Sequence, residues 1–240
     1  RFFEEGTFTS WCFIDWDHQS IGYDNLLKYG LNGLKEKAVA KQKDAITEEQ
    51  REFLDAMIAG IDCLITFAQM HSKLAEKMLE SENDPDIISN LRRIAKTAKY
   101  CPAESPKSFY EALNTILFVR EILCGIEGLG ISIFGQLDRL LYPYYKADIE
   151  SSKITEEEAY YLICSFLAIT DAKFDLSVAP ETSTTVNIGG VDANGNPVFN
   201  DITKMICKAM IELKLVNPKL NARVASNSPQ EYYDLLADMA

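Results

Sequence analysis

Residues 183–203 read STTVNIGGVDANGNPVFNDIT and combine a strand, a turn and the start of a helix. The stretch STTVNIGG alternates and is rich in Thr and Val, as expected of a β-strand. The following VDANGNP, with its glycine and asparagines, is typical of a turn. Asn200 can then cap a helix that reads DITKMICKAMIELKL. A strand followed by a helix is the pattern that yields parallel strands.

A second β-like segment, NARVAS (residues 221–226), follows Asn217 and Pro218 and precedes a helix start at Ser228 and Pro229. Two strands cannot close a sheet alone. Either partner strands lie outside this chain, or the two predicted strands form the edge of a larger sheet.

Helical patterns dominate the rest of the chain. Leucines at helical spacing predict a helix from Tyr23 onward, with Gly30 and Gly33 as weak points. Thr47 and Gln50 form a capping box ahead of a long helix. Further helix starts are marked at Asp84, Ser108, Thr155, Asn200 and Ser228. The expected fold class is mostly α with a few parallel strands.

The helix expected in FYEALNTILFVREIL (residues 109–123) is apolar nearly all round. A helix of this kind is normally buried. We therefore expect Leu113, Ile116, Leu117 and Leu123 to be mostly inaccessible.

Composition sets limits on the function. The 240 residues are 47% hydrophobic and 25% charged, which is ordinary for a globular protein, and the net charge is −12. Such an acidic chain is not expected to bind nucleic acid or an anionic membrane. No apolar run approaches the ~20 residues of a membrane span. The chain opens on Arg1 with no signal segment, so we expect a cytoplasmic protein and a piece of something longer.

Metal and nucleotide sites are not predicted. The six cysteines form no C-x-x-C pair and are expected to be buried, reduced thiols. The glycine-rich GIEGLGISIFG (residues 125–135) lacks the preceding strand and the Lys-Ser/Thr pair of a phosphate loop. With two histidines, a histidine-rich metal site is excluded. His71 is expected to be a partly exposed helix residue, whereas His18 precedes a helix start and could either face a cavity or have a structural role.

Four motifs follow one another in a specific order. They are P-x-S-F-Y-E-A-L (106–113), G-x-x-D-x-x-L-Y-P-Y-Y (135–145), I-G-G-x-D-x-x-G (188–195) and N-P-x-L-x-x-R (217–223), and HQSIGYDNLLKYGLNGL (18–34) precedes them. The set covers essentially the whole chain. It resembles the middle of a glycyl radical enzyme of the pyruvate formate-lyase and glycerol dehydratase family.

The resemblance implies that residues 1–240 are an internal portion of an α/β barrel surrounded by helices. In this family a glycyl radical near the C-terminus oxidises a cysteine, and the thiyl radical attacks the substrate. An S-adenosylmethionine-dependent radical activating enzyme installs the glycyl radical. By resemblance both radical loops lie beyond residue 240, so no catalytic residue is assigned and this fragment alone is expected to be inactive. The full-length protein is expected to be a homodimer, with no cofactor bound directly.

The resemblance also places substrate-binding residues in the first part of the chain. His18 corresponds to a histidine that hydrogen-bonds a substrate hydroxyl in dehydratase-type members. Trp16 could form a wall of the same pocket or pack under the helix. A pocket position that is polar in relatives aligns with Ile133, or with Ser132 if the alignment is shifted by one residue. An isoleucine at this position would deprive the substrate of a hydrogen-bonding partner. Gln136 stands where many relatives have an arginine.

Thr185 and Asn187 complete the predicted binding set, because alternate side chains of the strand TTVNIGG would face inward. The alternative for these two residues is plain sheet surface.

The function expected from the resemblance is that of an anaerobic, cytoplasmic dehydratase or lyase. It would cleave a C–O, C–N or C–C bond of a small polar substrate by radical chemistry. The alternatives are a formate C-acetyltransferase and a non-catalytic helical interaction module derived from this scaffold.

Overall fold

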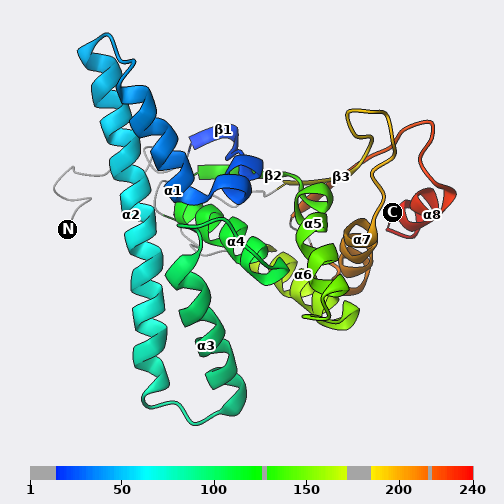
Figure 1. Ribbon diagram of the computed structural model, residues 1–240. Helices are drawn as coiled ribbons and strands as arrows, with labels where there is room; N and C mark the ends of the chain where they lie inside the picture. Colours follow the sequence, from blue (N-terminus) through cyan, green and yellow to red (C-terminus); the bar gives the residue numbers. More distant parts are fainter. Residues whose placement is uncertain (1–14, 126–128, 172–184, 216–217, 240) are drawn as a thin grey trace, which may run out of the picture. The chain divides into compact units, whose positions relative to one another are not determined.

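The computed structural model describes residues 15–125, 129–171, 185–215 and 218–239, and gives only the backbone for residues 15–20, 124–125, 129–132 and 171. Helices make up most of the described chain (Figure 1). In chain order the elements are β1 (Asp15–Ser20), α1 (Tyr23–Gln42), α2 (Glu48–Leu79), α3 (Pro85–Tyr100), α4 (Phe109–Gly125), β2 (Leu129–Gln136), α5 (Leu137–Glu150), α6 (Glu156–Asp171), β3 (Thr185–Gly189), α7 (Asp201–Leu213), β4 (Lys219–Arg223) and α8 (Gln230–Met239).

The strands form one sheet in the order β1-β2-β3-β4, and every neighbouring pair is parallel. This confirms the predicted fold class of mostly α with a few parallel strands. The two strands predicted from sequence are β3 and β4, the second of which begins two residues earlier than expected. β1 and β2 were not predicted. β2 lies in the glycine-rich segment, residues 125–135, for which the sequence predicts neither a strand nor a phosphate-binding loop. Helix α5, which contains Pro143, was not predicted either.

The chain divides into two compact units. The first contains the sheet and helices α5 to α8, and the second consists of residues 24–107 and 114–119. In the first unit α5 contacts β2, β3 and α7, while α7 also contacts α6 and α8. Fully buried side chains of this unit include Phe134, Leu137, Leu141, Ile163, Leu167, Val186, Ile188, Ile202, Ile206 and Tyr232.

Helix α1 shows where a weak point predicted from sequence becomes a break. Gly30 has φ 64° and ψ 175°, which interrupts the helical conformation within α1. The segment after α3 approaches closely, since a Cβ on Gly30 would lie 2.6 Å from the carbonyl carbon of Glu104. The amides of Leu31 and Asn32 donate to the carbonyls of Pro102 and Ala103, both at 2.9 Å. The break at Gly30 therefore exchanges helical hydrogen bonds for bonds to this segment.

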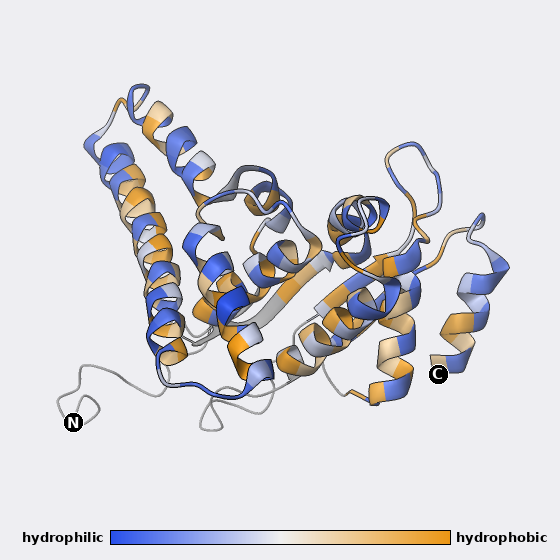
Figure 2. Ribbon diagram, turned by 60° about the horizontal axis from the view of Figure 1, so that its bottom comes forward, coloured by the Kyte–Doolittle hydropathy of each residue, from blue (hydrophilic) through white to orange (hydrophobic). Residues whose placement is uncertain are grey.

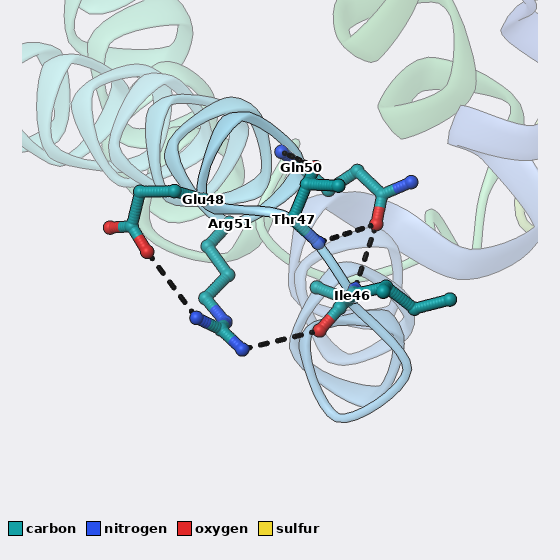
Figure 3. Close-up of polar contacts among 6 residues, drawn as sticks. Ile46, Thr47, Glu48, Gln50 and Arg51 are labelled. Atoms are coloured by element: carbon teal, nitrogen blue, oxygen red, sulfur yellow. Dashed lines mark hydrogen bonds and ion pairs between the residues drawn. The ribbon is translucent and has the colours of Figure 1, made fainter.

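Helix α2 begins at the predicted capping box. The Oγ1 of Thr47 accepts from the amide of Gln50 at 3.2 Å, and Gln50 Oε1 accepts from the amides of Thr47 and Ile46 at 3.3 and 2.8 Å (Figure 3). Arg51 bonds Glu48 at 3.3 Å across the first turn. Unpaired amides at the start of the helix thus gain partners from local side chains, as the sequence predicts.

Helix α4 is buried over most of its length, as expected. Leu113 and Ile116 are buried, whereas Leu117 is half-buried, as is Leu123. His71 is exposed, as predicted, with its ring against Phe67 and Phe118 of the same unit.

Helix α2 departs from the expectation that no segment could span a membrane. By length and composition it is the one helix of the described chain that could do so, and only 6% of its most apolar window is buried. Asp62, in the middle of α2, nevertheless forms an ion pair with Lys35 of α1 at 2.6 Å. This ion pair places one side of α2 against α1.

Candidate functional site

The sheet brings the sequence-predicted binding residues onto neighbouring strands. Parallel pairing aligns His18 of β1 with Ile131 of β2, and Ile133 of β2 with Thr185 of β3. Asn187 of β3 is aligned with Asn221 of β4. Because all strands run in the same direction, their C-terminal ends lie along one edge, where ligands of parallel sheets normally bind.

The two faces of the sheet differ in burial. Val186 and Ile188 of β3 are fully buried, whereas Thr185 and Asn187, which alternate with them, are only partly covered. In β2 the ring of Phe134 is buried, with its centroid 5.7 Å from that of Tyr23 and 5.2 Å from that of Phe166. Thr185 and Asn187 therefore lie on an open face, opposite the face that the helices cover.

The strand pairing bears on whether Ser132 or Ile133 takes the expected pocket position on the open face. Ile133 is the Cα partner of Thr185, and it is half-buried next to the buried Phe134. Side chains of directly paired residues in a parallel sheet point to the same side, so Ile133 lies beside Thr185 on the open face. Ser132 is paired instead with Gln19. The position next to Thr185 is therefore apolar in this chain.

The other predicted residues are placed by their backbone alone. His18 and Trp16 lie in β1 and Ser132 lies in β2, and their side chains are outside the described part of the structure. The register between β1 and β2 shifts between Asp15 and His18, a stretch that contains Trp16. The substrate-binding roles of these three residues stay predictions.

On β4 the open face continues with charged and polar groups. The Cα partner of Thr185 on this strand is Lys219, and both Lys219 and Asn221 are exposed. This face therefore offers hydroxyl, amide and ammonium donors. Among the described residues of the face none is a carboxylate or a thiol, so the described face offers mainly hydrogen-bond donors for a polar ligand and no thiol to carry a radical.

A buried carboxylate that the sequence analysis did not single out anchors the end of β3. Asp138, fully buried at the start of α5, accepts hydrogen bonds at 2.8 Å from the amide of Gly189 and from Oγ1 of Thr203, both on Oδ2. Its Oδ1 accepts from the amide of Arg139 at 2.8 Å. Asn200, the cap of α7, donates to the Asp138 carbonyl at 3.3 Å. Asp138 thus ties together α5, β3 and α7.

Burial sets the electrostatics of this anchor. Removal from water raises the pKa of Asp138 above its ordinary value, although its three hydrogen bonds act in the opposite direction. Burial, together with the nearby Asp138, also raises the pKa of the Cys207 thiol to about 11. Cys207 is therefore a protonated, unreactive core residue. Cys101 is buried as well, as the sequence predicts, but the prediction of buried thiols is wrong for Cys63, which is exposed on α2, and Cys164 is only partly buried.

Strand β3 ends at Gly189, whose amide bonds Asp138, and Gly190 follows directly. Gly189 and Gly190 have φ values of 72° and 79°. The carbonyl of Gly189 accepts a hydrogen bond from Nε2 of Gln136, and the amide of Gly190 donates to the carbonyl of Arg223 at 2.8 Å. Tyr232 of α8 packs directly against Gly189. The backbone immediately after Asn187 is therefore fixed from several sides.

The aspartate of the motif G-x-x-D-x-x-L-Y-P-Y-Y is Asp138, and its place in this motif was the one sign in the sequence that it has a structural role. Its partners could not be read from sequence because they lie 51 and 65 residues away. No group of His, Cys, Asp or Glu side chains in the described residues could hold a metal ion.

Comparison with known proteins gives a consistent result. The sequence profile of the family described as pyruvate formate lyase-like matches residues 3–240. An isethionate sulfite-lyase from Desulfovibrio desulfuricans is 31% identical over 236 residues, which is 91% of this chain and 28% of the relative. A (2S)-3-sulfopropanediol dehydratase from Klebsiella oxytoca is 29% identical over 229 residues, which is 89% of this chain and 28% of the relative. The chain thus spans less than a third of the length of these relatives.

A structural comparison agrees. The crystal structure of a glycyl radical enzyme from Archaeoglobus fulgidus superposes with a TM-score of 0.83 and 27% identity, over 93% of this chain and 30% of that one.

Proposed function

Because the chain belongs to the pyruvate formate lyase-like family, we propose that it is an internal part of a glycyl radical enzyme of the dehydratase or lyase type. The complete enzyme would cleave a bond to a polar substituent of a small polar substrate by radical chemistry. The relatives named above act on isethionate and sulfopropanediol, and another, from Clostridioides difficile, on trans-4-hydroxy-L-proline. The open face formed by β2, β3 and β4 is the structural observation that supports this function.

In this proposal the four parallel strands are one segment of an α/β barrel, and residues 1–240 are an internal portion of the barrel domain. The open face that carries Thr185 and Asn187 would then form part of the barrel interior. The face that contains Val186 and Ile188 is covered by helices, as in other α/β barrels. The outer strands of the described sheet, β1 and β4, would pair with strands supplied by the rest of the protein.

The residues of the open face suggest how the substrate is held. Thr185 and Asn187 would hydrogen-bond its polar groups together with His18, while Trp16 would contribute from β1. Ser132 pairs with Gln19 and alternates with Ile133 along β2, so Ile133 rather than Ser132 takes the pocket position in this proposal. Ile133, beside Thr185, provides no hydrogen bond and would disfavour a substrate hydroxyl at that point. A substrate other than glycerol therefore suits this pocket best.

The radical chemistry itself would come from other parts of the enzyme. A glycyl radical outside this chain, installed by an S-adenosylmethionine-dependent activating enzyme, would generate the thiyl radical that attacks the substrate. We further propose that the complete protein is a cytoplasmic homodimer that works under anaerobic conditions.

Anaerobic activation tests this assignment. Incubated with the activating enzyme and S-adenosylmethionine, the 240-residue chain should give no glycyl electron paramagnetic resonance doublet and no turnover, because the family mechanism needs two radical residues that this chain lacks by resemblance. The complete protein should give the doublet under the same conditions. A doublet from the 240-residue chain, or a complete protein that never forms one, would refute the proposal, and the second result would favour the non-catalytic interaction module.

The role of His18 can be tested in the complete enzyme. We expect His18→Ala to lower kcat/KM by a factor that corresponds to roughly 1–3 kcal/mol, the cost of one lost hydrogen bond to the substrate. The yield of glycyl radical should stay unchanged. Gln19→Ala is the matched control, since successive residues of a strand point to opposite faces. Unchanged kinetics combined with lower thermal stability would instead assign His18 a structural role.

A further inference from the structure

Gln136 is a polar side chain at the end of an otherwise apolar strand. It is the last residue of β2 and the N-cap of α5, yet its side chain makes no capping hydrogen bond. Its Nε2 donates instead to the carbonyl of Gly189 on β3. β2 carries hydrophobic residues up to Phe134 and ends on the hydrophilic Gln136, a change that can be followed in the hydropathy colouring of Figure 2. Gln136 therefore reaches across the sheet and leaves the start of α5 without a side-chain cap.

An irregularity in the strand pairing places Gln136 on the open face. The register between β2 and β3 shifts between Ile133 and Gly135. Before the shift Ile133 pairs with Thr185, and after it Gln136 pairs with Asn187. β2 thus has two residues between these pairs where β3 has one, and an extra residue of this kind re-aims the side chains that follow it. Without it, alternation would put Gln136 on the face opposite Ile133, whereas with it Gln136 lies beside Asn187.

The contact with Gly189 fixes which way the side-chain amide of Gln136 points. A carbonyl oxygen can only accept, so the group that faces it must be Nε2, and Oε1 points away from it. Gly189 is itself held, because its amide donates to Asp138 at 2.8 Å. Within the described part of the chain, neither Oε1 of Gln136 nor the side-chain amide of Asn187 has a hydrogen-bond partner. Both groups are therefore available to a ligand on the open face.

The open face is divided by polarity along the strands. The apolar Ile133 lies beside Thr185, and the polar Gln136 lies beside Asn187, which is two residues or about 6.6 Å further along β3. This polar level is at the C-terminal end of the strands, where ligands of parallel sheets normally bind. A hydroxyl suits it, because one hydroxyl can donate to Oε1 of Gln136 and accept from the amide of Asn187 at the same time. An anionic oxygen has no hydrogen to offer Oε1 and would be repelled by it.

From this placement we infer that Gln136 is a substrate-binding residue that determines specificity, because its Oε1 accepts a hydrogen bond from a substrate hydroxyl. The inference rests on the proposed function and adds a contact and an orientation to it. The substrate places a hydroxyl at the level of Gln136 and Asn187, and a part that needs no hydrogen bond beside Ile133. Any anionic group of the substrate lies away from Gln136.

Gln136→Arg separates the two ends of the side chain, because a guanidinium can still donate to the carbonyl of Gly189 but has no acceptor. The complete enzyme, activated anaerobically, is assayed with four compounds that carry a hydroxyl: glycerol, isethionate, (2S)-3-sulfopropanediol and trans-4-hydroxy-L-proline. For the compound that wild type turns over with the highest kcat/KM, Gln136→Arg should lower kcat/KM about three- to tenfold, as expected for one lost hydrogen bond. The yield of glycyl radical and the melting temperature should stay unchanged.

Two further variants complete the test. Gln136→Met removes the donor and the acceptor at similar length, so it should lower kcat/KM at least as much and also lower the melting temperature, since the carbonyl of Gly189 loses its partner. Gln230→Arg is the matched control, because Gln230 is exposed on α8 and lies outside the open face. It should leave both kinetics and melting temperature unchanged.

Four results would overturn the inference. A higher kcat/KM of Gln136→Arg for either sulfonate would show that an anionic oxygen faces this position. Unchanged kinetics in Gln136→Arg would show that Oε1 does not contact the substrate, and a lower melting temperature in addition would show that the rest of the protein donates to it. An enzyme that carries the glycyl radical but turns over none of the four compounds would also contradict it. The radical is measured before substrate is added, so a complete protein without the doublet refutes the proposed function itself.

Discussion

Asp138→Ala should lower the free energy of unfolding by about 3–5 kcal/mol in a urea titration of this chain. The substitution leaves the amide of Gly189 and the hydroxyl of Thr203 without the carboxylate that accepts from each at 2.8 Å. Each buried donor left unsatisfied costs about 1–3 kcal/mol, and the cavity left by the carboxylate adds to the loss. A loss below about 1 kcal/mol would show that the carboxylate does not anchor the end of β3.

Asp138→Asn is the matched variant, because its amide oxygen can still accept both of these bonds. Its effect should depend on pH. Burial raises the pKa of Asp138, so the native state binds the proton more tightly than the unfolded state does. The stabilising contribution of Asp138 is therefore complete below its ordinary carboxyl pKa and declines as the pH rises through the raised native value. The stability difference between wild type and Asp138→Asn should accordingly be largest in acid and shrink as the pH increases.

Gly189→Ala should lower the free energy of unfolding by about 2–5 kcal/mol. At φ 72° an alanine is strained by about 1–2 kcal/mol. Its Cβ would also overlap the Tyr232 hydroxyl and lie 2.6 Å from the carbonyl oxygen of Arg223, and overpacking of this kind typically costs about 1–3 kcal/mol. Thermal or urea unfolding measures the sum of both effects.

Gly195→Ala separates these two contributions. Gly195 has a comparable φ of 82°, but a Cβ there would meet no atom within 4 Å. It should therefore show the backbone strain alone. Adding Tyr232→Phe to Gly189→Ala removes the overlapping hydroxyl and should recover part of the loss. Equal losses for Gly189→Ala and Gly195→Ala would mean that the contact with Tyr232 is not restrictive.

The features predicted correctly from sequence are those determined by nearby residues. The capping box of Thr47 and Gln50 and the cap of Asn200 involve side chains within three residues of the amides they bond. The strand β3 was predictable because Val186 and Ile188 alternate with polar residues. Local chemistry decides each of these elements, so a single sequence is enough to predict them.

The features that were missed depend on distant contacts. β1 reads DWDHQS and has no apolar alternation, whereas in β2, LGISIFGQ, the alternating Leu129, Ile131 and Ile133 stand among glycines that are typical of a loop. They are strands because each pairs with a neighbour more than fifty residues away. α5 was missed because Pro143 normally interrupts a helix. For the candidate site, the sequence correctly placed Thr185 and Asn187 on one face of a strand, while the roles of Trp16, His18 and Ser132 stay predictions.

Helix α4 belongs to both compact units. Its first turn, residues 109–113, groups with the sheet-containing unit, residues 114–119 group with the α1 to α3 unit, and the remainder returns to the first. A continuous helix cannot lose its central turn and keep its cooperative hydrogen-bond ladder intact on both sides. Local unfolding of either unit would therefore remove packing partners from α4 and weaken the other unit. The two units should consequently behave as one cooperative folding unit, in which the central amides of α4 exchange with solvent only through global unfolding.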